Sequence, residues 1–174
     1  MHELFSLQGR TALITGGSRG IGRMIAEGFL KQGAKVYISA RKAAACDQTA
    51  AELSAFGTCV SLPADVSTVE GMRALVAAYA AREDQLDILV NNAGAAWGAP
   101  FAEFPESGWD KVVDLNLKTP FFLTQALHGH LRKAGQSFYN TSTLDLKKLL
   151  GKIIASRQNR GLAVGCLPQQ CQIL

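Results

Sequence analysis

A glycine-rich turn between an apolar strand and a helix constrains the fold of this chain more than any other feature. The apolar run 12–14 (Ala-Leu-Ile) is typical of a short buried strand. The turn Gly16–Gly22 follows, and helical spacing continues from Ile21 to Lys31. Strand, turn and helix in this order predict a phosphate-binding site, because a helix N-terminus offers unpaired N–H groups and a partial positive charge.

Three glycines of the turn have a predicted purpose. Gly16 and Gly20 let the backbone turn tightly and approach a pyrophosphate with no Cβ in the way. Gly22 lets the helix lie close against its strand. Such a glycine pattern is weak alone, and it gains weight here from the strand and helix that flank it.

The chain continues as an alternation of strands and helices. Further strands are predicted at 35–39, 58–62 and 86–90, and further helices at 43–56 and 69–82. Ser67 is the expected N-cap of the helix over 69–82. This order predicts a parallel sheet with helices on both faces, whose ligands bind at the carboxyl ends of the strands. Gly16, Arg41, Asp65 and Asn91 fall at or just beyond those ends.

The character of the sequence changes after a long helix predicted over 107–133, which Pro120 should kink or divide. Trp109 and the run 121–123 on this helix are interpreted as core or interface residues. We expect two parts, a dinucleotide-binding domain over 1–134 and a divergent, partly disordered tail over 135–174. A fifth strand is predicted at 151–156.

Composition and charge exclude several classes of function. Of 174 residues, 48% are hydrophobic and 18% charged, so the chain should be globular. The net charge of +4 is spread along the chain, and nucleic-acid binding is not expected. No apolar run approaches the roughly 20 residues of a membrane span, and no signal peptide is visible, so we expect a cytoplasmic protein. The scattered cysteines and histidines predict no disulfide and no metal site.

Several motifs stand in a recognisable order over residues 5–133. They are Thr15–Gly22, Asp65-Val66, Leu89–Gly94 (Leu-Val-Asn-Asn-Ala-Gly) and the Asn116-Leu-Lys segment. With these motifs the chain resembles the short-chain dehydrogenase/reductase family, and within it the 3-oxoacyl reductases of the rhamnolipid-associated type. The resemblance implies an α/β Rossmann-like fold with only about four of the family's strands present. It also implies NADP(H)-dependent hydride transfer on a small carbonyl or acyl substrate.

The resemblance and the chemistry of the residues together predict a cofactor-binding site. Arg41 follows the second strand, where NAD-specific folds place an acid, and a cation there would meet the 2′-phosphate of NADP(H). Arg19 can flank the same phosphate; the alternative is that both arginines are ordinary surface cations. The expected cofactor-binding residues are Gly16, Ser18, Arg19, Gly20, Ile21, Gly22, Arg41, Asp65, Val66, Asn92, Ala93 and Gly94.

Asp65, the Asn91–Gly94 motif and Asn116 each have both a family role and a plain alternative. The resemblance implies that Asp65 meets the adenine amino group, and the alternative is a turn aspartate that caps the next helix. It implies that the Asn91–Gly94 motif closes over the adenine ribose and stiffens the central strand; the alternative is a simple turn. For Asn116 it implies a catalytic role, distorting its helix and holding a water in a proton relay. The alternative is an exposed polar position.

The acid that the family's reaction needs is missing from the sequence. The resemblance implies a Tyr-x-x-x-Lys pair, yet four residues after Tyr37, Tyr79 and Tyr139 stand Arg, Glu and Thr. Ser156 and Ser142 are candidates for the family's serine, although an ordinary loop serine is the favoured interpretation of both. The enzyme activity of this chain is therefore uncertain, and we expect it to be inactive as written. The alternatives are a non-catalytic NADP(H)-binding protein, a defective subunit of an intact relative, and an unstable product without a role.

Three further expectations concern the tail and the long helix. The composition break near residue 134 suggests an altered reading frame, a splice variant or a truncation. Related enzymes pair through the long helix, which implies a homo-oligomer through 107–133. The last four residues from Cys171 formally fit a prenylation box, which we interpret as a chance match.

Overall fold

The computed structural model describes residues 6–134 and 138–141 and shows a five-stranded parallel sheet in the order β3-β2-β1-β4-β5. Every neighbouring pair is parallel, and β1 and β2 run in register with Thr15 beside Ser39. The bounds are β1 Thr11–Thr15, β2 Lys35–Ser39, β3 Cys59–Ser61, β4 Ile88–Asn91 and β5 Phe138–Thr141. The predicted parallel α/β sheet is therefore confirmed.

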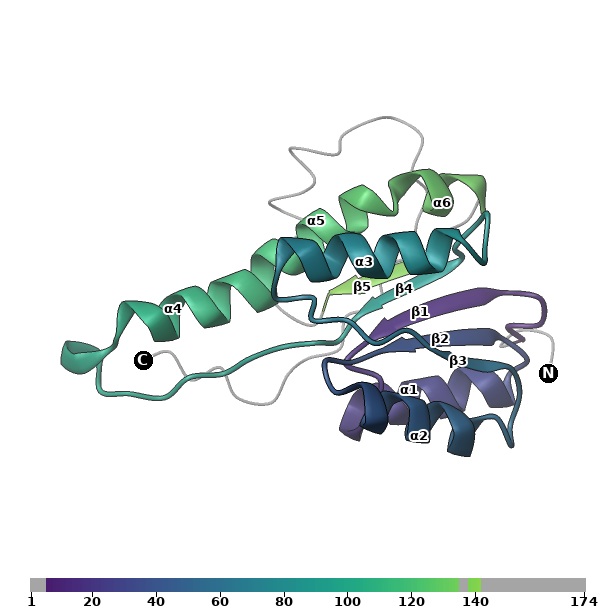
Figure 1. Cartoon of the computed structure of the whole chain (residues 1–174), viewed down its shortest axis with the longest axis horizontal. Helices are drawn as coiled ribbons and strands as arrows, with labels where there is room; N and C mark the ends of the chain where they lie inside the picture. Colours follow the sequence, from purple (N-terminus) through teal and green to yellow (C-terminus); the bar gives the residue numbers. More distant parts are fainter. Residues whose placement is uncertain (1–5, 135–137, 142–174) are drawn as a thin grey trace.

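Helices cover both faces of the sheet (Figure 1). Helices α1 (Gly20–Lys31) and α2 (Ala43–Leu53) cover one face, and α3 (Val69–Ala80), α5 (Thr119–Ala126) and α6 (His128–Lys133) cover the other. Side chains alternate along β1, so Ala12 and Ile14 join the core under α1 and α2, whereas Leu13 joins the core under α3 and α5. Both cores are built from apolar side chains of strands and helices, which fixes the register of the central strands.

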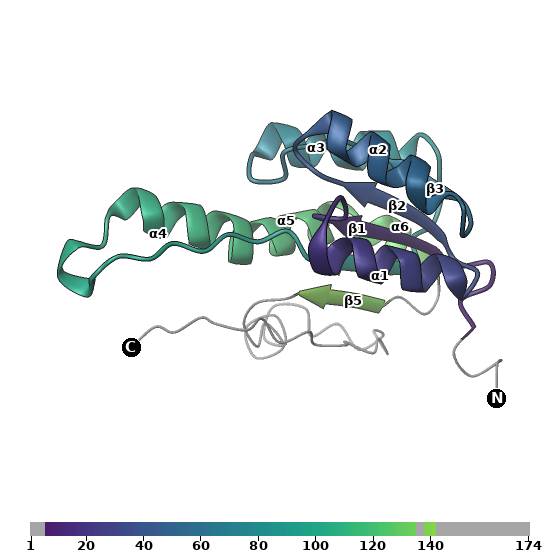
Figure 2. The same cartoon turned by 90° about the horizontal axis from the view of Figure 1, so that it is seen from below.

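An arm projects from the sheet at the carboxyl ends of the strands (Figures 1 and 2). It consists of the chain after β4, a short 3-10 helix η2 (Phe101–Glu103) and α4 (Glu106–Val113). The outgoing chain and α4 run side by side, and Trp97 packs so closely on Gly108 that a Cβ there would lie 2.7 Å from the indole ring. Lys111 sits over the same ring, with Nζ 5.1 Å from its centroid.

The helix predicted over 107–133 is divided rather than continuous. A π-helical segment, η3 (Asp114–Lys118), separates α4 from α5, and a second break falls at Leu127 before α6. Pro120 lies in the first turn of α5, where its missing N–H is tolerated. It cannot donate to the Asn116 carbonyl four residues earlier, so the wider turn precedes the proline.

Other boundaries differ from expectation in small ways. The strand at 35–39 is confirmed, and the remaining elements shift by one to three residues at their ends. The predicted cap Ser67 is wrong, because Thr68 is the N-cap of α3 and its Oγ1 accepts from Gly71 N at 3.0 Å. The fifth strand lies at 138–141, a short segment that the sequence analysis did not identify. The strand predicted at 151–156 and the tail over 142–174 lie outside the described residues.

A polar cluster ties β2 to the end of α3, far from the arm. The Tyr37 hydroxyl donates to Glu83 Oε1 at 2.6 Å, and Lys35 Nζ lies 2.5 Å from the same oxygen. Burial opposes ionisation of Glu83, but hydrogen bonds from Lys35 and Tyr37 outweigh it and lower the pKa of the carboxyl. Within the described residues no helix is long and apolar enough to cross a membrane.

We predict that Glu83→Gln lowers the free energy of unfolding at neutral pH by about 1 kcal/mol, since it removes a charge-assisted hydrogen bond while keeping the side-chain shape. Because the folded pKa of Glu83 is lowered, its contribution is present above the ordinary carboxyl pKa and is lost as the pH falls through the folded pKa. Urea unfolding at pH 7 and about pH 3 measures both values. Glu52→Gln, in an exposed pair with Arg23, is the control and should change little. An equal loss at both pH values would contradict this assignment.

Candidate nucleotide-binding site

A cavity of about 780 Å³ opens where β1, β2, β3 and β4 end. Every predicted cofactor-binding residue except Gly22 lines it, so the structure brings together motifs that are far apart in sequence. Six lining residues were not predicted as cofactor-binding residues: Ser39, Ala40, Lys42, Ala45, Ala64 and Leu115 of η3. Four of these six residues have small side chains, Ser39 and three alanines.

The glycine turn has the geometry of a phosphate cradle. Gly16 and Gly20 adopt φ values of +68° and +55°, the left-handed region that favours glycine. A Cβ at Gly20 would meet nothing within 4 Å, so the backbone faces open space at the start of α1. A Cβ at Gly22 would overlap the Gly16 carbonyl oxygen and Asn92, which explains its predicted packing role. The residues present therefore fit a phosphate group approaching the backbone.

The Thr15 hydroxyl connects the end of β1 to the segment that follows β4. Its Oγ1 accepts from the backbone N–H groups of Asn92 at 3.1 Å and Ala93 at 3.0 Å, and it donates to the Val90 carbonyl at 3.3 Å. Thr15 is 1% exposed, so these bonds are shielded from water. Thr15 was predicted only as part of a motif. Its hydrogen bonds to the segment after β4 could not be predicted, because they join residues more than 70 positions apart.

Further bonds hold the glycine turn in place. Asn92 Nδ2 donates to the carbonyls of Thr15 at 3.0 Å and Gly16 at 3.2 Å. Gly17 N donates to the Ser39 carbonyl, and Thr49 Oγ1 of α2 donates to the Ser18 carbonyl at 2.9 Å. The turn is thus anchored to β2, β4 and α2 before any ligand arrives.

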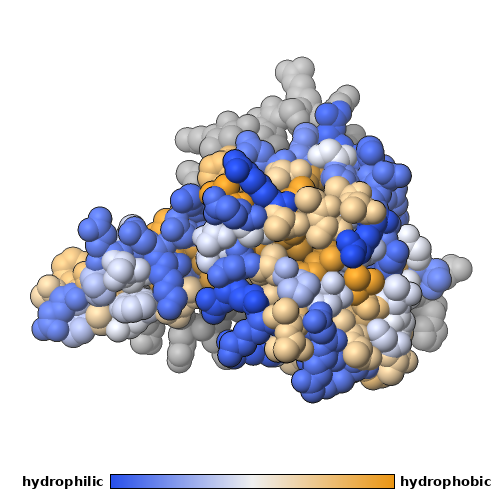
Figure 3. Space-filling model, in the orientation of Figure 1, coloured by the Kyte–Doolittle hydropathy of each residue, from blue (hydrophilic) through white to orange (hydrophobic). Residues whose placement is uncertain are grey.

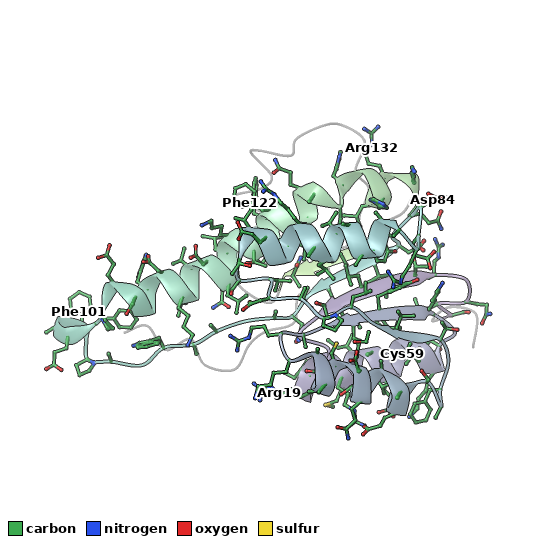
Figure 4. All side chains as sticks on the ribbon, in the orientation of Figure 1. Arg19, Cys59, Asp84, Phe101, Phe122 and Arg132 are labelled. Carbon is green, nitrogen blue, oxygen red and sulfur yellow. The ribbon has the colours of Figure 1, made fainter. Side chains whose placement is uncertain are left out.

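Two helix N-termini with basic caps point to this cavity. The N-cap residues are Arg19 for α1 and Lys42 for α2; neither helix has a side-chain cap or an acidic residue in its first turn. By contrast, α3 begins with the Thr68 cap and carries Glu70 in its first turn. Cations beside the positive end of a helix are unfavourable, so this arrangement is suited to an anion between them. Figure 4 shows Arg19 at the end of α1 below the departing arm.

Asp65 occupies the turn after β3, as its plain alternative predicted, but the cap of α3 is Thr68 and not Asp65. Its Oδ1 accepts from Ser67 N at 3.0 Å and from Ser67 Oγ at 2.6 Å. The carbonyl of Asp65 accepts from Thr68 N, which leads the chain into α3. The residue also lines the cavity, so its implied contact with an adenine amino group stays a prediction.

Asn116 holds the arm rather than lining the cavity. Its Oδ1 accepts from Ala95 N at 2.9 Å and its Nδ2 donates to the Ala95 carbonyl at 2.7 Å. A Cβ on Gly94 would lie 3.0 Å from Asn116 Oδ1, so Gly94 is needed for packing as well as for any ligand approach. Asn116 lies in the distorted segment η3, as the resemblance implied, and its relay role stays a prediction.

The tyrosines with described side chains lie away from the cavity. Tyr37 bonds to Glu83, and the Tyr79 hydroxyl donates to the Gln85 carbonyl at 2.7 Å. Burial raises the pKa of both hydroxyls, which makes them poor proton donors at neutral pH. The side chain of Tyr139 and the serines 142 and 156 lie outside the described residues. No group of metal-ligating side chains is found in the part of the chain that the structure describes.

Comparison with known proteins identifies relatives of this arrangement. The family model described as short chain dehydrogenase matches residues 10–138. The rhamnolipids biosynthesis 3-oxoacyl-(acyl-carrier-protein) reductase of Pseudomonas aeruginosa is 48% identical over 151 residues, covering 87% of this chain and 59% of that protein. Gluconate 5-dehydrogenase of Gluconobacter oxydans is 37% identical, covering 77% of this chain and 53% of the relative.

Solved structures show the same fold. The RhlG/NADP active-site complex of Pseudomonas aeruginosa has a TM-score of 0.77 at 49% identity, covering 80% of this chain and 57% of that one. A metagenomic short-chain oxidoreductase in complex with NADP has a TM-score of 0.80 at 28% identity, covering 94% and 84%. The chain spans between half and three fifths of the length of the curated relatives above. The ordered motifs, the sheet and these matches show that the chain belongs to the short-chain dehydrogenase/reductase family.

Proposed function

We propose that this chain binds NADP(H) in the cavity at the carboxyl ends of its strands. The observation that carries the proposal is the pair of basic helix N-termini without side-chain caps, Arg19 on α1 and Lys42 on α2, which line the same cavity as the glycine turn. Two of the solved relatives named above are complexes with NADP, which supports the same ligand here. The chain would hold the adenosine and pyrophosphate through the motifs gathered in the cavity.

The residues after β2 favour the 2′-phosphorylated dinucleotide. Ala40 and Arg41 line the cavity where an NAD-specific site would carry an acid for the ribose hydroxyls. A guanidinium group matches a phosphate through parallel N–H donors, and Arg19 adds a second cation. We therefore propose a preference for NADP(H) over NAD(H).

The proposed reaction class is reduction of a carbonyl or 3-oxoacyl compound, for which the bound nicotinamide would supply hydride. The support for this reaction class is the similarity to the Pseudomonas aeruginosa reductase. It does not rest on any substrate-contacting residue of this chain. The reaction also needs a positioned proton donor, and these 174 residues contain no Tyr-x-x-x-Lys. We propose that the polypeptide on its own binds the dinucleotide without turning it over.

Replacement of Arg41 tests the 2′-phosphate assignment. Arg41→Gln should weaken NADPH binding by about tenfold or more while leaving NADH binding nearly unchanged, because a charge-assisted contact to the phosphate is lost. NADPH and NADH fluorescence titrations measure both affinities. Arg23→Gln is the matched control, since Arg23 pairs with Glu52 on the surface and does not line the cavity. Equal weakening of both dinucleotides by Arg41→Gln would contradict the assignment.

A turnover assay separates binding from catalysis. We expect the unmodified chain to bind NADPH but to show no oxidation of NADPH with a 3-oxoacyl substrate above the rate without protein. Absorbance at the NADPH band follows the reaction, and an intact short-chain reductase serves as the positive control. Clear turnover would be consistent with NADP(H) binding and would refute the proposal that the chain is catalytically inactive.

We also propose that two copies associate through the outer face of α4 and α5. Trp109 is 60% exposed and Phe122 45% exposed on these helices, where Figure 4 shows Phe122 on the outer side of α5. On the face seen in Figure 3, hydrophobic residues lie among hydrophilic ones. Exposed aromatic side chains are enriched at protein–protein interfaces.

Light scattering tests this association. Phe122→Asp should shift the particle mass from two copies to one, because it places a charge in the proposed interface. Phe56→Asp is the control, since Phe56 has the same 45% exposure but lies after α2 on the other side of the sheet. A wild-type chain of single-copy mass would refute the proposal.

A further inference from the structure

A buried threonine at the start of α5 bonds to the wall of the cavity. Thr119 is 3% exposed, and its Oγ1 donates to the Val66 carbonyl at 2.7 Å. The two residues are 53 positions apart, and Val66 lines the cavity after β3. A helical serine or threonine often donates to the carbonyl four residues earlier, as Ser54 does to Ala50 at 2.8 Å. Thr119 instead donates to a remote segment, so its bond fixes the chain after β3 against α5.

This bond is connected to the Asp65 carboxylate through one peptide unit. The peptide between Val66 and Ser67 is planar and trans, so its carbonyl and its N–H point in opposite directions. The carbonyl accepts from Thr119 Oγ1, and the N–H donates to Asp65 Oδ1 at 3.0 Å. Rotation of this peptide would break both bonds together. The Thr119 hydroxyl therefore holds the Asp65 carboxylate in place through Val66 and Ser67.

The Asp65 carboxylate lies where the adenosine of the proposed ligand would be. Among the described residues that line the cavity, Asp65 is the acidic one. It follows β3, and Arg41, the proposed partner of the 2′-phosphate, follows the neighbouring strand β2. The two bonds from Ser67 use Oδ1, and a carboxylate has further acceptor sites. A carboxylate only accepts hydrogen bonds, so its partner on the adenine base would be the 6-amino group.

We propose that Thr119 is a positioning residue for adenine recognition, whose hydroxyl holds the Asp65 carboxylate toward the adenine amino group. The inference rests on the proposed function and adds a residue that none of the recognised motifs contains. It also gives the divided helix a further purpose, because Thr119 directly follows the π-helical segment η3. The wider turn of such a segment rotates the residues after it relative to a regular α-helix, and here the Thr119 hydroxyl meets Val66.

The proposal predicts that one substitution reduces discrimination between two bases. Thr119→Val keeps the side-chain shape and removes the donor, so the affinity for NADPH should fall about three- to tenfold. The hypoxanthine analogue of NADPH carries a carbonyl oxygen in place of the amino group, so its affinity should change by less than about twofold. Thr119→Ser keeps the hydroxyl and should retain the wild-type preference for NADPH. A merely structural threonine would change both affinities by the same factor.

The experiment uses calorimetric titrations with NADPH and its hypoxanthine analogue, after a thermal melt of each variant. Tyr79→Phe is the matched control, because the Tyr79 hydroxyl also donates to a backbone carbonyl at 2.7 Å, that of Gln85, but does not line the cavity. It should lower the melting temperature and leave both affinities unchanged. In an Asp65→Ala chain, Thr119→Val should cause no further loss of NADPH affinity, because no carboxylate is left to position.

The outcomes separate this inference from the proposed function. If the wild-type chain binds NADPH and Thr119→Val weakens both ligands equally or neither, the positioning role is refuted and the NADP(H) site stands. A further loss in the Asp65→Ala chain, or a wild-type chain that does not prefer NADPH to the analogue, would also refute the inference alone. A wild-type chain that binds neither ligand refutes the proposed function as well. Should Thr119→Val fail to fold, Thr119→Cys, a weak donor, must show an intermediate loss of NADPH affinity for the proposal to hold.

Discussion

The site depends on the hydrogen bonds that the Thr15 hydroxyl makes between β1 and the segment after β4. These bonds place Asn92 and Ala93 beside the glycine turn, although they are more than 70 residues away in the chain. Asn92 then returns two bonds from its side chain to the carbonyls that begin the turn. Because donors and acceptors are paired within the protein, the turn is pre-organised and a ligand need not pay to order it.

The charges around the cavity are arranged for a ligand rather than for stability. A helix gains from a capping oxygen or an acidic residue in its first turn, as α3 does with Thr68 and Glu70. Helices α1 and α2 instead start at Arg19 and Lys42 with neither feature. The enclosed Ser39 hydroxyl adds another unfavourable group in the same place. Residues that lower stability and gather around one cavity are expected at functional sites.

Much of the fold follows from sequence patterns, because strands and helices here differ clearly in period and the glycines mark the turns. The run 36–38 is apolar and follows Gly33 closely, and the strand predicted at 35–39 is confirmed. The motif residues were expected at strand ends, and a parallel sheet necessarily brings those ends together. The helix predicted over 107–133 shows where sequence patterns stop being informative. The helical pattern of the sequence continues through 114–118, and only Pro120 indicates a break near the π-helical segment.

Other features depend on contacts that no local pattern encodes. Thr15 and Ser39 are paired residues at the ends of β1 and β2. The Thr15 hydroxyl is hydrogen-bonded and the Ser39 hydroxyl is not, a difference that the sequence around each residue does not predict. Asn116 was expected at a functional position, but its pairing with both backbone groups of Ala95 required the arm to be in place. The short strand at 138–141 is held by its pairing with β4.

The central claim is that the cavity formed by the glycine turn and the ends of β2, β3 and β4 receives NADP(H). Backbone amide chemical shifts recorded by NMR during an NADPH titration test it most directly. The account predicts saturable shifts at Gly16–Gly22, at Arg41 and Lys42 and at Asn92–Gly94, while the amides of Lys35 and Glu83 at the other end stay unchanged. Shifts confined to other surfaces, or no shifts at millimolar NADPH, would contradict it.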